Sequence, residues 1–144
     1  MKILIINGPN LNLLGKREPE IYGSATYEDL VQYIDRLSRE WGFTYKIVQT
    51  NHEGTIIDFL HEAIDHYQGI VINPGAYTHY SYAIHDAIKA IQIPTVEVHL
   101  SDITKRESFR AVSVIAPACV TQFYGEHFKS YYRAIKYLLE VTNV

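Results

Sequence analysis

Residues 2–10 read KILIINGPN, and this stretch does most to decide the fold. Its aliphatic residues Ile3–Ile6 form an unbroken run, which is typical of a strand that is covered on both faces. Asn7-Gly8-Pro9-Asn10 then has the composition of a tight turn. The sequence therefore predicts a buried strand over residues 2–6 that ends in a polar loop.

The alternation of strand and helix continues along the chain. Short apolar runs predict further strands, and apolar residues at helical spacing predict the helices between them. The predicted strands cover residues 2–6, 43–48, 69–72, 95–99 and 112–115, and the predicted helices cover about residues 26–41, 56–68, 81–92 and 126–141. This alternation favours a parallel sheet. We therefore expect an α/β fold, flavodoxin-like and doubly wound, with a five-stranded parallel sheet and helices on both faces.

One helix and one loop carry stronger local signals. Thr26-Tyr27-Glu28-Asp29 reads as a capping box that opens a helix, and Gly42 suits the end of that helix. Residues 11–24 show no periodicity. A loop of this length inside a compact domain is usually functional, so we expect it to act as a lid.

Composition limits the kinds of protein that this chain can be. Its 144 residues predict one domain over residues 1–144, and the 47% hydrophobic content excludes a disordered chain. The net charge is -3 with no basic run, so neither nucleic acid nor an anionic membrane is an expected partner. The single cysteine, Cys119, excludes a disulfide framework. No apolar run resembles a signal peptide or a membrane span, so we expect a soluble, cytoplasmic protein.

Polar segments follow three of the predicted strands. In doubly wound folds, ligands bind outside the carboxyl ends of the strands, near the point where the strand order reverses. The segments at that edge are residues 7–10, 73–79 and 97–102. A binding site is therefore expected there.

Three familiar kinds of site are not expected. The glycines between Gly8 and Lys16 are too far apart for a phosphate loop, and Arg17 stands where Ser or Thr would hold magnesium. The seven His residues include no H-E-x-x-H pattern, so no metal is expected. Only Lys16 and Lys105 lie near the ligand edge, in charged loops that favour the protonated amine, so a lysine imine is not expected.

Acid–base chemistry has two candidate groups. Glu97 and His99 lie two residues apart on one predicted strand, so their side chains share a face. A carboxylate beside an imidazole fixes its tautomer and stabilises the imidazolium, as a general acid requires. An edge strand with an ordinary polar face would give the same spacing, so both interpretations stay open.

Tyr22 is a candidate base in the predicted lid, close in sequence to Lys16 and Arg17. Lowering the pKa of a phenol by about three units requires roughly 4 kcal/mol of preferential phenolate stabilisation. A guanidinium brought against the oxygen as the lid closes would supply much of this. The chain has 12 Tyr residues, so a packing role for Tyr22 stays open.

Taken together, the sequence motifs of this chain resemble those of type II 3-dehydroquinate dehydratases. The matching segments are spread over almost the whole chain in a specific order and spacing. They are Asn7–Gly15, Arg17–Gly23, Asn51–Gly54, Asn73–His79, Glu97–Ser101 and Arg106–Arg110. The resemblance implies dehydration of 3-dehydroquinate to 3-dehydroshikimate, in the shikimate pathway or in quinate breakdown, with no cofactor, metal or imine.

The resemblance also implies a role for each catalytic residue. Tyr22 would act as a phenolate and remove a proton from the carbon next to the ketone, and His99 would protonate the departing hydroxyl. Arg17 matches the lid arginine that favours the phenolate. Asn10 matches the residue that positions a water at the enolate oxygen, and Glu97 matches the partner that orients His99.

Substrate binding and assembly follow from the same resemblance. The implied substrate-binding positions are Asn73, His79, Asp86, Leu100, Ser101 and Arg110, with Leu100 and Ser101 acting through their backbone. In the family, the residue that matches Asp86 reaches the site of a neighbouring subunit. A homo-oligomer is therefore expected, a dodecamer built from trimers.

Some positions depart from the family pattern. Asp102 stands where an Asn is usual, and an inward-pointing carboxylate there would weaken the binding of an anionic substrate, whereas an outward-pointing one would change nothing. Thr55 replaces a common acidic residue, and His85 replaces a usual Arg. None of these residues belongs to the implied catalytic set.

Two other interpretations compete with a dehydratase. A non-catalytic flavodoxin-like module would need clustered acidic residues or a Ser/Thr-rich loop after its first strand, where this chain has residues 7–10. A degenerate relative would bind the substrate without turnover. The presence of Arg17, Tyr22 and His99 argues against the second interpretation.

Overall fold

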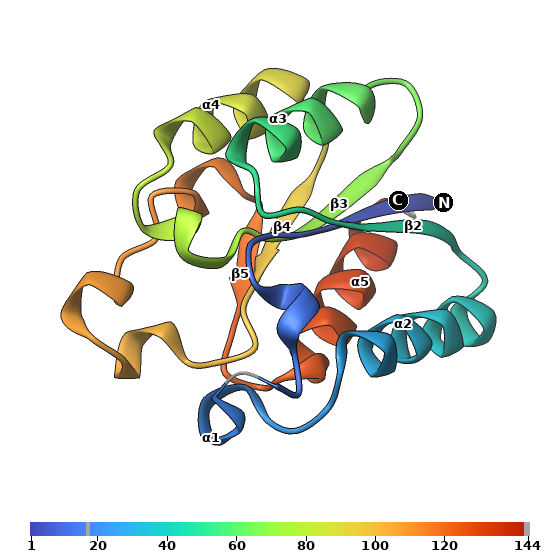
Figure 1. Ribbon diagram of the computed structural model, residues 1–144. Coiled ribbons are helices and arrows are strands. Elements are labelled where there is room, and N and C mark those ends of the chain that lie inside the picture. Colours follow the sequence, from blue (N-terminus) through green and yellow to red (C-terminus); the bar gives the residue numbers. More distant parts are fainter. Residues whose placement is uncertain (17, 143–144) are drawn as a thin grey trace.

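The fold is a twisted parallel sheet with helices on both faces (Figure 1). The computed structural model describes residues 1–16 and 18–142, and at Tyr22 it describes the backbone alone. The strands are β1 (Lys2–Asn7), β2 (Thr44–Gln49), β3 (Gly69–Asn73), β4 (Thr95–Val98) and β5 (Thr121–Phe123). Their order is β2-β1-β3-β4-β5, and all neighbours run parallel. The predicted flavodoxin-like, doubly wound class is confirmed.

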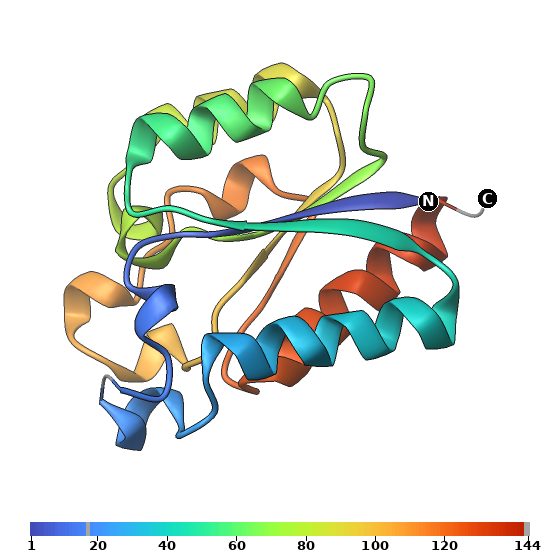
Figure 2. The same cartoon turned by 45° about the vertical axis from the view of Figure 1, so that its right-hand side comes forward.

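Two helical layers cover the sheet. Helices α2 (Tyr27–Trp41) and α5 (Phe128–Thr142) lie on one face, and α3 (Glu53–Glu62) and α4 (Tyr82–Ile91) lie on the other (Figure 2). Alternate residues of β1 enter the two cores, with Ile3 and Ile5 packing toward α2 and α5, and Leu4 and Ile6 toward α3 and α4. This two-sided burial explains why the first strand is an unbroken aliphatic run.

The predicted start of α2 is confirmed in detail. The Thr26 hydroxyl accepts from the backbone N–H of Asp29 at 3.1 Å, and the Asp29 carboxylate accepts from the backbone N–H of Thr26 at 2.9 Å. The two bonds satisfy donors that the first turn of a helix would otherwise leave unpaired. Gly42 ends the helix with a φ of 71°, a left-handed conformation that glycine adopts without a steric penalty.

The predicted fifth strand is wrong. Residues 112–115 form an irregular segment, and β5 lies further along the chain, where Thr121 pairs with Val96 of β4. The apolar run at 112–115 reflects the burial of Ile115 under α3 and α4. Ser113 in the same run turns toward Glu97 on β4, and the backbone N–H groups of Ile115 and Ala116 donate to its hydroxyl oxygen and not to a neighbouring strand.

Two other segments differ from the prediction. Helix α3 ends at Glu62, not near Gln68, because the chain reverses at Asp65 (φ 66°) to return to the sheet. There Gln68 donates its backbone N–H to the carbonyl of Lys2 at 3.0 Å. The predicted lid contains the short helices η1 (Leu11–Leu13) and α1 (Pro19–Tyr22).

Loops from the carboxyl ends of β1, β3 and β4 gather at one edge of the sheet (Figure 1). They include the short helices η2 (Gly75–His79), η3 (Ile103–Lys105) and η4 (Ser108–Arg110). The reversal of strand order between β1 and β3 lies at this edge, as the sequence predicts. Within the described part of the chain, no helix combines the length and apolarity needed to cross a bilayer.

Gly8 and Gly54 form a matched pair for testing how tightly this edge is packed. A Cβ at Gly8 would lie 2.8 Å from the backbone of Pro74, whereas a Cβ at Gly54, in α3, meets nothing within 4 Å. Overpacking of this kind typically costs about 1–3 kcal/mol, so Gly8→Ala should destabilise the fold. Gly54→Ala should stabilise it by about 0.5–1 kcal/mol, because alanine favours helix. Urea unfolding measures both, and equal stabilities would contradict the close approach.

Candidate active site

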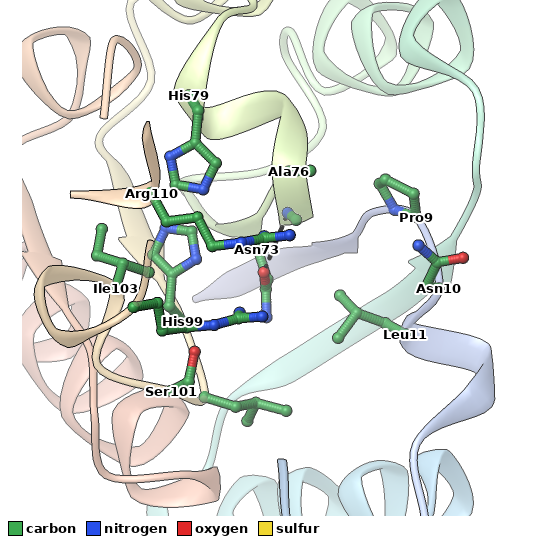
Figure 3. Close-up of a pocket in the computed structure, with 13 residues that line it drawn as sticks. Pro9, Asn10, Leu11, Asn73, Ala76, His79, His99, Ser101, Ile103 and Arg110 are labelled. Atoms are coloured by element: carbon green, nitrogen blue, oxygen red, sulfur yellow. Dashed lines mark hydrogen bonds between the residues drawn. The ribbon is translucent and has the colours of Figure 1, made fainter. Parts of the chain in front are cut away.

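A cavity of about 220 Å³ opens at the carboxyl ends of β1, β3 and β4 (Figure 3). Backbone and side chains from three loops line it, and just over half of the lining residues are polar or basic. The lining residues are Pro9, Asn10, Leu11, Asn73, Gly75, Ala76, His79, His99, Leu100, Ser101, Ile103, Arg106 and Arg110. This is the place where the strand order predicts a ligand to bind.

The structure brings most of the predicted site residues together. Those that line the cavity are Asn10, Asn73, His79, His99, Leu100, Ser101 and Arg110. Glu97 is fully buried and contacts His99. Asp86 is not a lining residue, since it lies on α4 with 80% of its side chain exposed. Arg17 lies outside the described residues, and so does the side chain of Tyr22.

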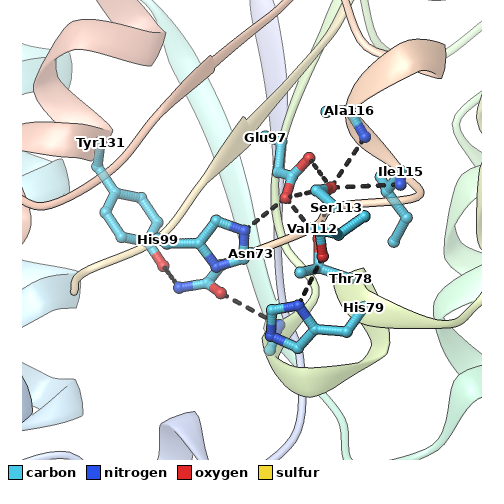
Figure 4. A network of polar contacts seen from close by, with 11 residues as sticks. Asn73, Thr78, His79, Glu97, His99, Val112, Ser113, Ile115, Ala116 and Tyr131 are labelled. Atoms are coloured by element: carbon cyan, nitrogen blue, oxygen red, sulfur yellow. Dashed lines mark hydrogen bonds and ion pairs between the residues drawn. The ribbon is translucent and has the colours of Figure 1, made fainter. Parts of the chain in front are cut away.

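A buried carboxylate–imidazole pair forms one wall of the site (Figure 4). Glu97 is the third residue of β4, and His99 follows the end of that strand, so both side chains project from one face. Nε2 of His99 lies 2.5 Å from Oε2 of Glu97. Both residues are almost completely removed from solvent, with His99 5% exposed and Glu97 0% exposed. A buried pair of this kind, not an edge-strand polar face, accounts for the spacing.

Hydrogen bonds keep the Glu97 carboxylate charged. Burial alone would raise its pKa, but the bonds from His99, Thr78 and Ser113 outweigh burial and hold the pKa below its ordinary value. Thr78 donates to Oε2, and Ser113 lies 2.8 Å from Oε1. An ionised carboxylate at this position favours a proton on the imidazole beside it.

His79 presents a hydrogen-bond acceptor to the cavity. Its Nδ1 lies 2.8 Å from the carbonyl oxygen of Val112, and a carbonyl can only accept, so Nδ1 carries a proton. Burial lowers the pKa of His79, and the positive charges of His99 and Arg110 lower it further. In the neutral ring, Nε2 is therefore an acceptor suited to a substrate hydroxyl.

A directed chain of hydrogen bonds fixes the amide of Asn73 at the cavity floor. The backbone N–H of Gly75 donates to Oδ1 of Asn73 at 3.2 Å, so Nδ2 faces the Tyr131 hydroxyl, 3.1 Å away. That hydroxyl then donates to Oδ1 of Asn7 at 2.6 Å, and Nδ2 of Asn7 lies 3.4 Å from the hydroxyl of Tyr27. Since Tyr131 is fully buried on α5, the helix packed beneath the sheet determines which way Asn73 points.

The carboxylate of Asp102, which departs from the family pattern, bonds within its own loop. Its carboxylate accepts from the backbone N–H of Thr104 at 3.0 Å and lies 3.8 Å from Nζ of Lys105. The hydrogen bond from the Thr104 side chain is the main reason why the pKa of Asp102 is lowered. Asp102 is not among the lining residues, so it takes the outward orientation of the two that the sequence leaves open.

The departure at His85 lies outside the cavity. His85 pairs with Asp86 at 3.0 Å on the surface of α4.

Two arginines give the cavity a positive rim. Arg110 is held by Glu107, with Nε 2.6 Å from Oε2, and Arg106 lies 3.9 Å from a carboxylate oxygen of Glu18 in the lid segment. Arg106 lines the cavity although sequence spacing alone does not single it out. In the described residues no cluster of three or more His, Cys, Asp or Glu side chains is arranged to hold a metal ion. The rim therefore suits an anionic organic ligand.

Sequence spacing also gives no signal for Thr78, Ser113 or Tyr131. Hydroxyl residues are common in loops and helices, and the site residues that these hydroxyls bond, Glu97 and Asn7, lie at least 16 residues away along the chain. Only a hydrogen-bond partner search in three dimensions identifies them.

Removal of the Tyr131 hydroxyl tests this floor. Tyr131→Phe keeps the packing volume but leaves Oδ1 of Asn7 buried without its donor, which typically costs about 1–3 kcal/mol. Tyr45→Phe is the matched control, because the Tyr45 hydroxyl bonds a partly exposed carboxylate of Asp35 at 3.0 Å, and its loss should cost under about 1 kcal/mol. Urea unfolding compares the two variants, and an equal loss of stability would contradict a special role for Tyr131.

Comparisons with known proteins agree on one family. The family model described as "Dehydroquinase class II" matches residues 1–139. The 3-dehydroquinate dehydratase of Caldicellulosiruptor bescii is 59% identical over 143 residues, which is 99% of each chain. That of Bacillus licheniformis is 52% identical over 141 residues, which covers 98% of this chain and 97% of the relative.

Solved structures give the same result. The type II dehydroquinase of Butyrivibrio crossotus superimposes with a TM-score of 0.94 at 51% identity, covering 96% of this chain and 97% of the other. The type II dehydroquinase of Propionibacterium acnes gives a TM-score of 0.91 at 40% identity, covering 95% and 94%. On these matches, which span both fold and sequence, the chain belongs to the class II dehydroquinase family.

Proposed function

We propose that this chain dehydrates 3-dehydroquinate to 3-dehydroshikimate through an enolate, with Tyr22 as the base and His99 as the acid. Membership of the family supports the overall reaction and its place in the shikimate pathway. The single observation that carries the acid–base part is the buried Glu97–His99 pair in the cavity wall. A fixed carboxylate stabilises the imidazolium that a general acid must begin from.

The proposed reaction balances in two steps. The Tyr22 phenolate takes a proton from the carbon next to the ketone, and the electron pair of that C–H bond forms the enolate. The enolate then collapses, the neighbouring C–O bond breaks, and the His99 imidazolium gives its proton to the departing hydroxyl, which leaves as water. Tyr22 ends protonated and His99 neutral, so the net transfer of one proton from Tyr22 to His99 through solvent restores both.

Charge developing in the first step needs stabilisation. Arg17 is proposed to favour the phenolate, and Asn10 to hold a water at the enolate oxygen. Asn10 lies on the cavity rim with a φ of 69°, and its backbone N–H donates to Oδ1 of Asn51 at 3.1 Å. Asparagine is one of the few residues that adopts this left-handed conformation readily, which supports a positional requirement at residue 10.

The substrate is a carboxylate with several hydroxyls, and the cavity offers partners for both. We assign the carboxylate to Asn73 and to the backbone N–H groups of Leu100 and Ser101. The carbonyls of Leu100 and Ser101 accept from the backbone of His127 and Gly125 at 3.0 and 3.1 Å, and these bonds steady that segment. His79 and Arg110 are assigned to the hydroxyls, where an acceptor and a fork of donors complement them.

No imine and no metal take part in this proposal. The lining residues described above include two arginines and no lysine, which supports an elimination without a covalent enzyme–substrate bond. A positive cavity rim is consistent with an anionic substrate.

The reaction is assigned to one domain over residues 1–144, of which the family model matches residues 1–139. A location in the cytoplasm stays a prediction from the sequence.

Hydrogen exchange at the substrate separates the two catalytic roles. His99→Ala should lower the dehydration rate by about 10²–10⁴-fold but still exchange the substrate proton for deuterium in D₂O, because Tyr22 still forms the enolate. Tyr22→Phe should lose both exchange and dehydration while binding substrate normally. Product absorbance and NMR of the substrate measure the two processes, with Tyr45→Phe as the control. Full dehydration by either variant would remove that residue from the mechanism.

We further propose that the enzyme is a homo-oligomer, a dodecamer built from trimers, in which Asp86 completes the site of a neighbouring subunit. The carboxylate of Asp86 is 80% exposed and does not line the cavity of its own chain, which supports a role between subunits. Tyr80 and Tyr82, 60% and 69% exposed, lie just before it in the chain and add apolar surface there.

Mixing inactive variants tests the shared site. Asp86→Ala should lower activity without dissociating the oligomer, and His99→Ala should be nearly inactive. When the two variants are unfolded and refolded together, some sites combine an intact His99 with an intact Asp86 from the neighbour, so activity should return in part. Light scattering gives the oligomer mass. A fully active monomer, or no recovery in oligomers shown to be mixed, would contradict the shared site.

A further inference from the structure

We propose that Thr78 and Ser113 are positioning residues that hold the Glu97 carboxylate ionised and aligned with His99. They thereby set the lower pH limit at which His99 serves as the acid. This inference rests on the proposed function and extends it to two side chains that do not line the cavity. They act through Glu97 and have no contact with the substrate.

Two separate loops bring these hydroxyls to β4. Thr78 lies in η2, after β3, and is 0% exposed. Ser113 lies in the irregular segment before η5 (Ala116–Ala118). The Thr78 hydroxyl donates to Oε2 of Glu97, and the Ser113 hydroxyl lies 2.8 Å from Oε1 and 3.0 Å from Oε2 (Figure 4).

The direction of the Ser113 hydroxyl proton follows from its other partners. Backbone N–H groups of Ala116 and Ile115 donate to Oγ of Ser113, at 3.0 and 3.3 Å. An amide N–H can only donate, so these contacts occupy the lone pairs of Oγ. Of the acceptors that remain, the charged oxygens of Glu97 at 2.8 and 3.0 Å lie nearer than Oγ1 of Thr78 at 3.1 Å, so the hydroxyl proton is directed at Glu97. The hydrogen bonds that run from the backbone N–H groups of Ile115 and Ala116 through Ser113 to Glu97 therefore all donate in the same direction.

Three donors now face one carboxylate: His99, Thr78 and Ser113. Protonating Glu97 would place a fourth donor against these three, in a site removed from bulk solvent. The donor set therefore favours the charged form, which is the form that stabilises a proton on His99. The titratable groups that face Glu97 are His99 just after β4, His79 on η2 and Cys119 before β5.

The sign of the pH effect follows directly. The pKa of Glu97 is held below its ordinary value, so a variant that lacks one donor should raise it. As the pH falls, such a variant neutralises Glu97 earlier than the native enzyme and loses the acid earlier. The acidic limb of kcat should therefore move to higher pH, and kcat should recover at pH values well above that limb.

The test uses Thr78→Val, which is close in shape and lacks the hydroxyl, and Ser113→Ala. In each variant the acidic limb should move up by roughly one to two pH units, the loss expected for one hydrogen bond to a charged group. Thr78→Ser keeps the donor and should restore the native profile. Thr95→Val is the matched control. Thr95 is a buried threonine on β4, the strand that carries Glu97, and its hydroxyl donates to the carbonyl of Ile93 at 2.9 Å and not to Glu97.

Carboxyl-carbon NMR reads the Glu97 titration independently of catalysis, with Glu97→Gln identifying the signal. The inference requires that Glu97 and the kcat limb move together in both variants and not in Thr95→Val. An unchanged Glu97 titration, or a kcat loss equal at every pH, would overturn the positioning role. If Glu97 moves while the kcat limb stays, the link to catalysis is overturned. The assignment of His99 as the acid is tested separately by His99→Ala. It holds if this variant exchanges the substrate proton for deuterium at the native rate while its dehydration rate falls.

Discussion

The charge buried at Glu97 is the constraint on which the rest of the site depends. A carboxylate with no solvent exposure is tolerated only if donors replace the water it has lost. Here the donors come from the residue that follows β4, from η2 and from the segment before η5. These segments must therefore fold around the carboxylate together, and the orientation of His99 in the cavity wall is a consequence of that requirement.

The sheet supplies the frame for this charge. Parallel strands present their carboxyl ends at one edge, and the reversal of order between β1 and β3 opens the space that the cavity occupies. The backbone N–H of Gly8 donates to the carbonyl of Asn73 at 2.7 Å, which brings the two loops together. Tyr131 then ties the cavity floor to α5. Core packing and site geometry are thus parts of one arrangement.

Much of this architecture could be predicted from local sequence. The KILIIN run and the capping box at Thr26 act through neighbours in the chain, so their signals survive without a structure. The two-residue spacing of Glu97 and His99 also places them correctly on one face. The segment at 112–115 misled the prediction because an apolar run looks the same in a strand as in a loop packed under helices. Ser113, Thr78 and Tyr131 could not be found, since their roles arise only from distant partners.

The proposed reaction is an elimination by acid–base chemistry in a cavity whose described lining has no lysine. Its most direct test is to treat the enzyme with sodium borohydride while 3-dehydroquinate is bound, remove the reagent, and follow the absorbance of the conjugated enone product. Activity should survive this treatment unchanged, because no imine forms that borohydride could reduce. Loss of activity, with a substrate-derived mass added to a lysine, would contradict it.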